Sequence, residues 1–401
     1  LVDYGLTATH LEIVTGSDFT YDSDTNITTE TGYLTAGYVR IIDTTVNLIY
    51  VEADRLYMYN SIINETCDSN MKCGVKVTGN QQSEIDETLI NLTSSSAFIS
   101  IRGSNVKLTD SVIQATGSIN LTATVKLTIT DSLVEQFGTS DSILRIDAPS
   151  FSFSGYDLRS NDVMEVVSNQ SFTFDNDTNF EADEFWFRVA TLTIEEVNLQ
   201  ASLKVYGTNM TVDSVDNIAD LYFGGDTGVI QDSSIGNLEF DSPSFTIRNV
   251  TFSGSLDANS DIFFMDGATG ITTLKLRSNA TIYNSSHSSN SDIDVTNLVI
   301  RNLTQTGGSH SLKATSLDAF DYVLEVAPDF DVTEFELLWP APSDSYTFDF
   351  DGNLTIKDAK YIATSGVGSK TFRFDNDNNV SLTFLNVTLR LNTTSDFNYA
   401  F

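Results

Sequence analysis

Long apolar runs and a recognisable leader are both missing from this 401-residue chain. No run of about 18 apolar residues occurs, which excludes a transmembrane helix, and the first residues lack the basic-then-apolar order of a signal peptide. The chain begins with Leu1 rather than with Met. We therefore interpret it as a mature or excised form whose targeting segment was removed, although a fragment of a larger protein would look the same.

Basic residues are few, with 21 Lys and Arg against 55 Asp and Glu, so the formal net charge is -34 and the pI about 4.1. A surface of this sign repels phosphate backbones and anionic lipid headgroups, which disfavours nucleic acids and membrane surfaces as partners. Cations, basic proteins and neutral sugars fit better. Hydrophobic residues still make up 40% of the chain, enough for a packed core.

Histidine and cysteine are also scarce. His10, His287 and His310 belong to no metal-binding or nucleophile-activating motif, and we expect each of them at the surface. Cys67 and Cys73 flank a short polar loop, a spacing that suits a local disulfide in an oxidising compartment. A pair of free thiols is the alternative, and a zinc site is disfavoured because no histidine or second cysteine pair lies close by.

Proline, with five residues, and Asn-Gly or Asp-Gly hairpin turns are rare, whereas short runs of alternating apolar and polar residues recur along the whole chain. Residues 125–129, Val-Lys-Leu-Thr-Ile, are one example. This period of two predicts half-buried strands, and long helical patterns are nearly absent. The sequence predicts an all-β fold, either one elongated repeat structure or two or three tandem β-sandwiches.

Similar polar corners follow many of these runs and favour the repeat structure. Residues 109–113, Thr-Asp-Ser-Val-Ile, residues 130–134, Thr-Asp-Ser-Leu-Val, and residues 231–235, Gln-Asp-Ser-Ser-Ile, each predict a strand, a corner and a second strand. The spacing of the corners centres on roughly 20 residues, which is within the range of solenoid repeats. We attribute the drift in this spacing to corners that hold insertions of different length.

Three Phe-x-Phe pairs precede acidic turn residues, at residues 172–174, 348–350 and 372–374. Both rings of a pair lie on the same side of a strand, so stacked coils would place them in an internal aromatic ladder. The alternative with a specific function is an aromatic box that binds a cofactor. Core packing is the interpretation that we favour.

This pattern of strands and corners resembles the right-handed parallel β-helix of the pectin-lyase-like superfamily and its non-enzymatic repeat relatives, over approximately residues 41–401. The resemblance implies an elongated right-handed β-solenoid of roughly 15 to 18 coils. We expect residues 1–40 to form an N-terminal cap or lead-in coil. Residues 322–344 hold three of the five prolines, and we expect an insertion there.

The catalytic signatures of that superfamily are missing. The sequence has neither the Asp-Asp and Gly-His neighbourhoods of polygalacturonase-like members nor the Arg or Lys cluster that suits pectate lyase chemistry. Residues 366–371, Gly-Val-Gly-Ser-Lys-Thr, resemble a phosphate loop only superficially, and we interpret them as a turn. We therefore expect no enzyme, with a polysaccharide lyase or hydrolase that uses paired carboxylates as the alternative.

Acidic turns leave calcium as the one candidate metal ion, and we expect no other cofactor. The oxygen ligands could come from one of two groups, Asp175, Asp177, Glu181 and Glu184, or Asp375 and Asp377. No complete calcium-loop pattern is present, so solvated acidic corners are the favoured interpretation.

N-x-[ST] sequons are the strongest positive signal in the chain. Fifteen occur, at Asn26, Asn64, Asn91, Asn120, Asn169, Asn176, Asn209, Asn249, Asn279, Asn284, Asn302, Asn353, Asn379, Asn386 and Asn392. This number exceeds the chance expectation and predicts a secreted, extracellular protein with an N-glycosylated surface.

Ten sequons have an apolar middle residue, namely Ile27, Leu92, Leu121, Met210, Val250, Ala280, Leu303, Leu354, Val380 and Val387. Because side chains alternate along a strand, burial of this middle residue would point the Asn and the Ser or Thr outward. The alternative is that an Asn-rich and Thr-rich solenoid produces such triplets by accident.

These observations predict an extracellular structural glycoprotein that stacks head to tail into a surface filament or coat. A solenoid has two open ends with unpaired backbone groups, and residues 397–401 stay strand-like to the last Phe. An adhesin or receptor rod is one alternative, which a glycan-free stripe of exposed aromatics would favour. A carbohydrate-active enzyme is the other, which carboxylates clustered on consecutive coils would favour.

Overall fold

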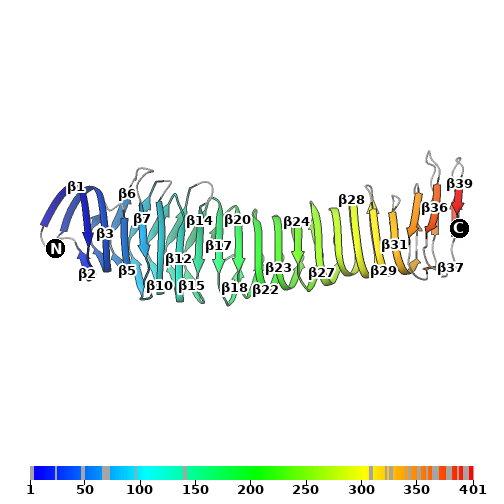
Figure 1. Ribbon diagram of the computed structural model, residues 1–401, viewed down its shortest axis with the longest axis horizontal. Coiled ribbons are helices and arrows are strands. Elements are labelled where there is room, and N and C mark those ends of the chain that lie inside the picture. Colours follow the sequence, from blue (N-terminus) through cyan, green and yellow to red (C-terminus); the bar gives the residue numbers. More distant parts are fainter. Residues whose placement is uncertain are drawn as a thin grey trace. The chain divides into compact units, whose positions relative to one another are not determined.

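The computed structural model describes residues 4–22, 25–46, 50–65, 73–94, 97–138, 142–306 and 310–320, and a series of strands between residues 323 and 400. These residues form 39 strands and no helix, and the parallel strands stack as a β-solenoid of about 14 turns (Figure 1). The predicted all-β solenoid is confirmed, with slightly fewer turns than expected. Among the described residues no helix is long and apolar enough to cross a membrane.

The chain divides into two compact units, Leu1–Thr191 and Leu192–Phe401, called unit 1 and unit 2 below. The strands of unit 1 are β1 (Tyr4–Val14), β2 (Asp18–Tyr21), β3 (Thr25–Ile42), β4 (Thr45–Val46), β5 (Tyr50–Tyr59), β6 (Ile62–Glu65), β7 (Cys73–Val77), β8 (Ser83–Asp86), β9 (Leu89–Leu92), β10 (Ala97–Thr109), β11 (Val112–Ala115), β12 (Ile119–Thr130), β13 (Leu133–Gln136), β14 (Ile143–Asp147), β15 (Phe151–Ser154), β16 (Asp157–Ser160), β17 (Val163–Val167), β18 (Ser171–Phe174), β19 (Phe180–Glu181) and β20 (Glu184–Arg188).

Unit 2 contains the remaining strands, of which β21 begins at the boundary itself. They are β21 (Thr191–Glu195), β22 (Ser202–Asp213), β23 (Ile218–Gln231), β24 (Ser234–Asp241), β25 (Ser244–Arg248), β26 (Thr251–Phe252), β27 (Ser255–Asp266), β28 (Ile271–Thr306), β29 (His310–Phe320), β30 (Val323–Leu324), β31 (Pro328–Leu338), β32 (Pro340–Ala341), β33 (Ser345–Asp349), β34 (Leu354–Lys357), β35 (Lys360–Ala363), β36 (Lys370–Asp375), β37 (Leu382–Leu385), β38 (Thr388–Leu391) and β39 (Phe397–Ala400).

In unit 1 a sheet of seven short strands forms one side of the coils, in the order β19-β16-β13-β11-β9-β6-β4. Its strands pair in parallel and in register, so equivalent residues of successive coils form columns. The opposite wall is made by longer strands such as β10 and β12, whose pairing shifts register between Gly103 and Asn105. The successive corner residues Asn60, Glu87, Asp110 and Asp131 lie 27, 23 and 21 residues apart because the connections of this unit differ in length.

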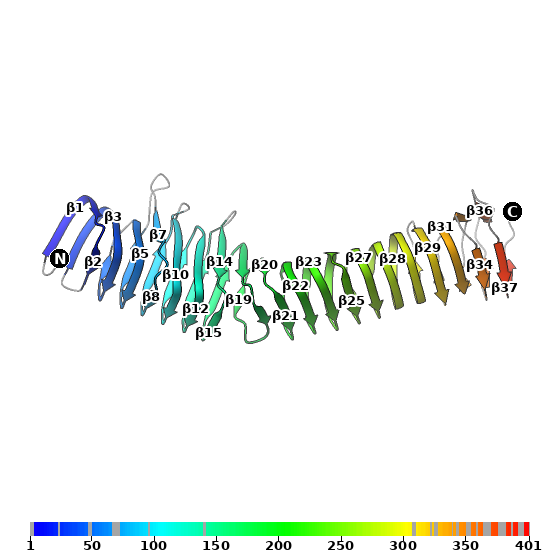
Figure 2. The same ribbon diagram turned by 60° about the horizontal axis from the view of Figure 1, so that its bottom comes forward.

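The coils of unit 2 between residues 203 and 283 are more uniform, and residues of neighbouring coils that pair in register lie 17 or 18 residues apart. Figure 2 shows the strands β22 to β28 as successive rungs. Strands β22 and β23 pair in register from Leu203 with Leu221 to Asp213 with Gln231. A smaller sheet, β32-β35-β38, lies further along the chain.

Alternation along the strands separates the core from the surface. In β12 the side chains of Leu121, Leu127 and Ile129 are fully buried, whereas Asn120, Thr122 and residues 124–126 are more exposed. Each such aliphatic side chain contributes about 1.5–3 kcal/mol when it leaves water. Stacking of equivalent apolar rows makes this core continuous from one coil to the next within each unit.

Phe172 and Phe174, the first of the three Phe-x-Phe pairs, are both buried. The ring of Phe174 lies 5.5 Å from that of Phe185 and 6.0 Å from that of Phe187, both in β20. The predicted core ladder is confirmed for this pair. Phe348 and Phe374 pair in backbone register, and the side chains of the second and third pairs lie outside the described residues.

The sequence-based domain boundaries fall within strands. The boundary at residue 40 lies inside β3, which pairs with β1 from Thr25 onward and with β5 further along. The expected insertion at residues 322–344 includes β31, which pairs with β29 in parallel. These boundaries remain sequence-based predictions.

Candidate functional site

Most of the described corners between a strand and the following short segment turn on a residue with positive φ. In unit 1 these residues have φ between 43° and 58°, and they are Asp43, Asn60, Glu87, Asp110, Asp131 and Gly155. In unit 2 they have φ between 44° and 71°, and they are Glu196, Ser214, Asp232, Asn249, Gly267 and Asn284. Gly, Asn and Asp tolerate this left-handed conformation best, which explains the recurrent Asp and Asn of the predicted corners.

A buried hydroxyl follows most of the left-handed residues of unit 1. The Thr88 amide donates to the Oγ of Ser111 at 3.1 Å, and the Ser111 amide donates to the Oγ of Ser132 at the same distance. The Ser111 hydroxyl in turn donates to the carbonyl of Thr109 at 2.6 Å. These bonds satisfy the backbone where the chain leaves the sheet, so Ser and Thr at this position are explained by structure.

A hollow of about 460 Å³, the corner groove, runs along these corners in unit 1. Its lining includes the left-handed residues Asp43, Asn60, Glu87 and Asp110 and the apolar column Ile62, Leu89 and Val112. The Asn60 amide donates to the Asp43 carboxylate at 2.8 Å.

The electrostatic field around the corner groove is negative. The pKa of the neighbouring Tyr59 is raised, chiefly by the Glu87 carboxylate and further by burial and by Asp43. The groove can therefore accept hydrogen bonds from hydroxyl or amine groups, and it disfavours anions. Because left-handed geometry accounts for Asp43 and Asp110, their presence is not evidence of a catalytic pair.

Among the described side chains, those considered for calcium do not gather into a ligand set. The Asp175 carboxylate accepts hydrogen bonds from the Asp177 amide at 3.1 Å and the Thr178 hydroxyl at 3.0 Å, which makes it a turn cap. Glu181 is largely exposed and lies 3.7 Å from Arg159. Glu184 begins β20 and Asp375 ends β36, while Asp377 lies outside the described residues.

Within the described part of the chain, no group of three or more His, Cys, Asp or Glu residues is arranged to hold a metal ion. His287 is buried, so the expectation of a surface position is wrong for this residue. His287 lies three residues after the corner at Asn284, and both it and Ser285 are buried while Ser286 between them is more exposed. The alternating segment after this corner is too short for its period to be recognised in the sequence. The side chains of His10 and His310 lie outside the described residues.

Nine sequon asparagines have described side chains. Asn64, Asn169, Asn176, Asn209, Asn249, Asn279 and Asn284 are exposed, and Asn91 and Asn120 are half-buried. Asn64 and Asn91 pair in register, and the Asn91 amide donates to the Asn64 side-chain oxygen at 3.4 Å. Asn249 and Asn284 occupy left-handed corners and donate to Asp232 at 3.0 Å and Asp266 at 2.9 Å.

The apolar middle residues of the sequons are buried wherever the structure describes them, at Leu92, Leu121, Met210, Val250, Ala280 and Leu303. This confirms the predicted alternation, with the middle residue inward and the Asn outward. The side chains of Asn26 and Asn302, within β3 and β28, are outside the described set, as are the whole residues Asn353, Asn379, Asn386 and Asn392.

Cys73 is the first residue of β7 and is fully buried. Its expected partner Cys67 lies outside the described residues, so the disulfide between them stays a prediction.

A cluster of ion pairs around the buried Glu165 of unit 1 was not predicted. Glu165, whose side chain is 6% exposed, accepts from Arg145 on the preceding coil and Arg188 on the following one, both at 2.8 Å. Arg145 also pairs with Asp147 at 2.9 Å. A single charge inside the run Val-Met-Glu-Val-Val at residues 163–167 was the signal available in the sequence. The distribution of these contacts over three coils indicates a structural role.

Unit 2 presents a flat outer face, which we define by the outward residues of β22, β23, β24, β27 and the start of β28 between Ser202 and Arg277. One column is formed by Lys204, Tyr222, Glu239, Asp257 and Lys275, which pair in register. The next column is formed by Tyr206, Gly224, Asp241, Asn259 and Arg277.

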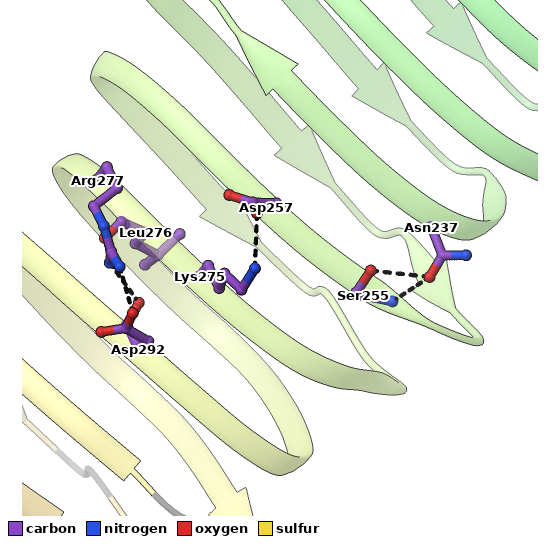
Figure 3. Close-up of polar contacts among 7 residues, drawn as sticks. All are labelled: Asn237, Ser255, Asp257, Lys275, Leu276, Arg277 and Asp292. Carbon is purple, nitrogen blue, oxygen red and sulfur yellow. Dashed lines mark hydrogen bonds and ion pairs between the residues drawn. The ribbon is translucent and has the colours of Figure 1, made fainter.

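Polar contacts link the coils across this flat face (Figure 3). The Asn237 side-chain oxygen accepts from the amide of Ser255 at 2.8 Å and from its hydroxyl at 2.9 Å. Lys275 pairs with Asp257 at 3.2 Å, and Arg277 pairs with Asp292. These bonds fix the orientation of the surface side chains from one coil to the next.

No family model, no curated protein and no solved structure matches this chain. The parallel β-solenoid is established by the strand pairing alone. The resemblance to the pectin-lyase-like superfamily rests only on the sequence pattern of strands and corners.

Proposed function

We propose that this chain is an extracellular, N-glycosylated structural protein built on a parallel β-solenoid. One observation carries the proposal. In the five sequons for which both positions are described and the middle residue is apolar, that residue is at most 3% exposed, while the asparagine points outward and is exposed or half-buried. These five acceptors are Asn91, Asn120, Asn209, Asn249 and Asn279.

This arrangement lets one triplet serve both the core and the surface. The middle residue anchors the strand, and the flanking Asn and Thr leave the core undisturbed when a sugar is attached. An acceptor that can be modified without loss of packing is the physical requirement for dense glycosylation of a repeat fold. The predicted Cys67–Cys73 disulfide would suit the same oxidising compartment.

A non-enzymatic role forms part of the proposal. It is supported by the backbone geometry that explains two acidic residues of the corner groove, Asp43 and Asp110. Membership in the pectin-lyase-like superfamily, with its right-handed coil, is the finer proposal on fold.

End-to-end association is the proposed mode of assembly. The terminal coils of any parallel stack have backbone groups that no neighbouring coil pairs, and these groups must be capped or bound by another molecule. A second copy offers the same strand spacing, so a head-to-tail contact could continue the ladder. Adhesion or reception through a lateral face is the runner-up.

The intact mass of the secreted protein before and after treatment with a peptide N-glycosidase tests glycosylation. We expect a loss of mass equal to many glycan units, because the outward asparagines are distributed over both units. An unchanged mass would remove the glycoprotein part of the proposal.

A further inference from the structure

The flat face of unit 2 contains no sequon asparagine between Ser202 and Arg277. The sequons of the same coils lie elsewhere. Asn209 and Asn279 lie further along β22 and β28, beyond the residues of the two columns. Asn249 and Asn284 occupy left-handed corners. Glycans on all four positions would therefore leave the flat face uncovered.

Two tyrosine rings lie together on this face. Tyr206 is 40% exposed, and its ring centroid is 5.6 Å from that of Tyr222, with 51° between the ring planes. Gly224 stands beside Tyr206 in the column, and a Cβ added there would lie 3.2 Å from the Tyr222 hydroxyl and 3.6 Å from a Tyr206 ring carbon. The absence of a side chain at Gly224 thus leaves room for both rings.

Polar groups that can bind hydroxyls surround the pair. Glu239 and Asp241 are exposed on the next coil, and the Asp241 carboxylate accepts from Asn259 at 3.0 Å. The Asp220 carboxylate, on the coil before Asn237, accepts a hydrogen bond from the side-chain amide of Asn237 at 2.7 Å. These contacts hold carboxylate and amide groups in place around the rings, so little conformational entropy is lost when a ligand binds.

The local charge argues against an anionic ligand. The pKa of Tyr222 is raised by burial first and then by Tyr206, Asp241 and Glu239. Lys204 lies beside Tyr222 in its column, and Lys275 and Arg277 are ion-paired with Asp257 and Asp292. An uncharged ligand rich in hydroxyls complements this mixture of carboxylates, amides and aromatic rings.

We propose that the flat face of unit 2 binds a neutral polysaccharide, with pyranose rings against Tyr206 and Tyr222 and sugar hydroxyls bonded to Glu239, Asp241 and Asp220. Pyranose rings have an apolar face that packs on an aromatic ring, while their equatorial hydroxyls donate to carboxylates at the edge. The two columns of this face continue from one coil to the next, which suits an extended polymer. This activity goes beyond the structural role and does not depend on glycosylation of the chain.

The test is retention of the full chain on insoluble cellulose, chitin and β-1,3-glucan, with immobilised polygalacturonate as the anionic comparison. We expect retention on at least one neutral polymer and none on polygalacturonate. Tyr206→Ala combined with Tyr222→Ala should weaken binding about tenfold, which corresponds to the loss of two aromatic contacts. The matched control is Tyr283→Ala, an outward tyrosine beside the Asn284 corner, which should leave binding unchanged.

Glu239→Gln with Asp241→Asn is a second variant that leaves both rings in place and should also weaken binding. Thermal unfolding of each variant shows whether the fold is kept. Binding is measured with and without enzymatic deglycosylation, which separates the protein surface from the attached sugars. The proposal is overturned if no neutral polymer retains the chain, if polygalacturonate alone retains it, or if folded variants at both sites bind like the unmodified protein.

Discussion

Glu165 shows how much a single residue depends on neighbours that are distant in sequence. Its carboxylate is almost fully enclosed, and it accepts from arginines on both adjacent coils. Hydrogen bonds to a charged group are worth about 1.5–3 kcal/mol, more than those between neutral partners. The cluster therefore ties three successive coils of unit 1 together.

We expect Glu165→Gln to lower the free energy of unfolding by about 1–3 kcal/mol, because the amide removes the charge that both guanidinium groups share. The change should appear as a lower midpoint in urea, monitored by circular dichroism. Asp257→Asn is the matched control in an exposed pair with Lys275, where a loss below about 1 kcal/mol is expected. Equal losses for the two variants would contradict the assigned role of Glu165.

Gly267 occupies a left-handed corner with φ of 71°, and an added Cβ would lie 2.7 Å from the side-chain oxygen of Asn249. Gly267→Ala should therefore destabilise unit 2 by about 1–2 kcal/mol. Asp110→Gly makes the opposite change at a corner with φ of 47° and should alter stability by only about 0.5 kcal/mol. Thermal unfolding measures both, and tolerance of alanine at position 267 would refute the strain argument.

The residue types in the sequence were enough to predict the corners but not the ion pairs of Glu165. The Asp-Ser corners were visible in the sequence because left-handed geometry and buried hydroxyls select the same residues in coil after coil. Glu165 had an unusual setting, but its partners Arg145 and Arg188 lie 20 and 23 residues away. Connections of varying length in unit 1 hide which residues share a column, so the cluster could not be assembled from sequence.

At the scale of the element, strand alternation was the most predictable feature. The sequon with Leu121 in its middle lies in β12, where alternate residues are buried against neighbouring coils. By contrast, the flat face of unit 2 depends on register between strands, which fixes Tyr206 beside Gly224. Composition and period say which side of a strand is apolar, but not which side chains of separate coils meet.

Leu121→Ala should cost about 2–5 kcal/mol, because it leaves a cavity in a row of aliphatic side chains. Leu133 belongs to β13 and points outward into the half-exposed column that continues from Val112, so Leu133→Ala should cost much less. Urea unfolding of the two variants compares them directly. A similar loss for both would mean that inward and outward positions have been assigned wrongly.

At the scale of the whole molecule, assembly is the property that the proposed structural role requires. Sedimentation velocity over a wide range of protein concentration should show species that grow with concentration, and electron microscopy should show end-to-end particles. Monomers at every concentration would contradict head-to-tail assembly. Glycosylation and the solenoid fold would be unaffected by that result.

The central claim is that the sequons of this solenoid are surface acceptors that carry glycans. Site-resolved mass spectrometry of peptides from the secreted protein tests it most directly, since peptide N-glycosidase converts each occupied asparagine to aspartate. We expect conversion at outward asparagines such as Asn209, Asn249 and Asn279, and none at Asn259, which is exposed but belongs to no sequon. Unmodified asparagine at all of these sequons would contradict the account.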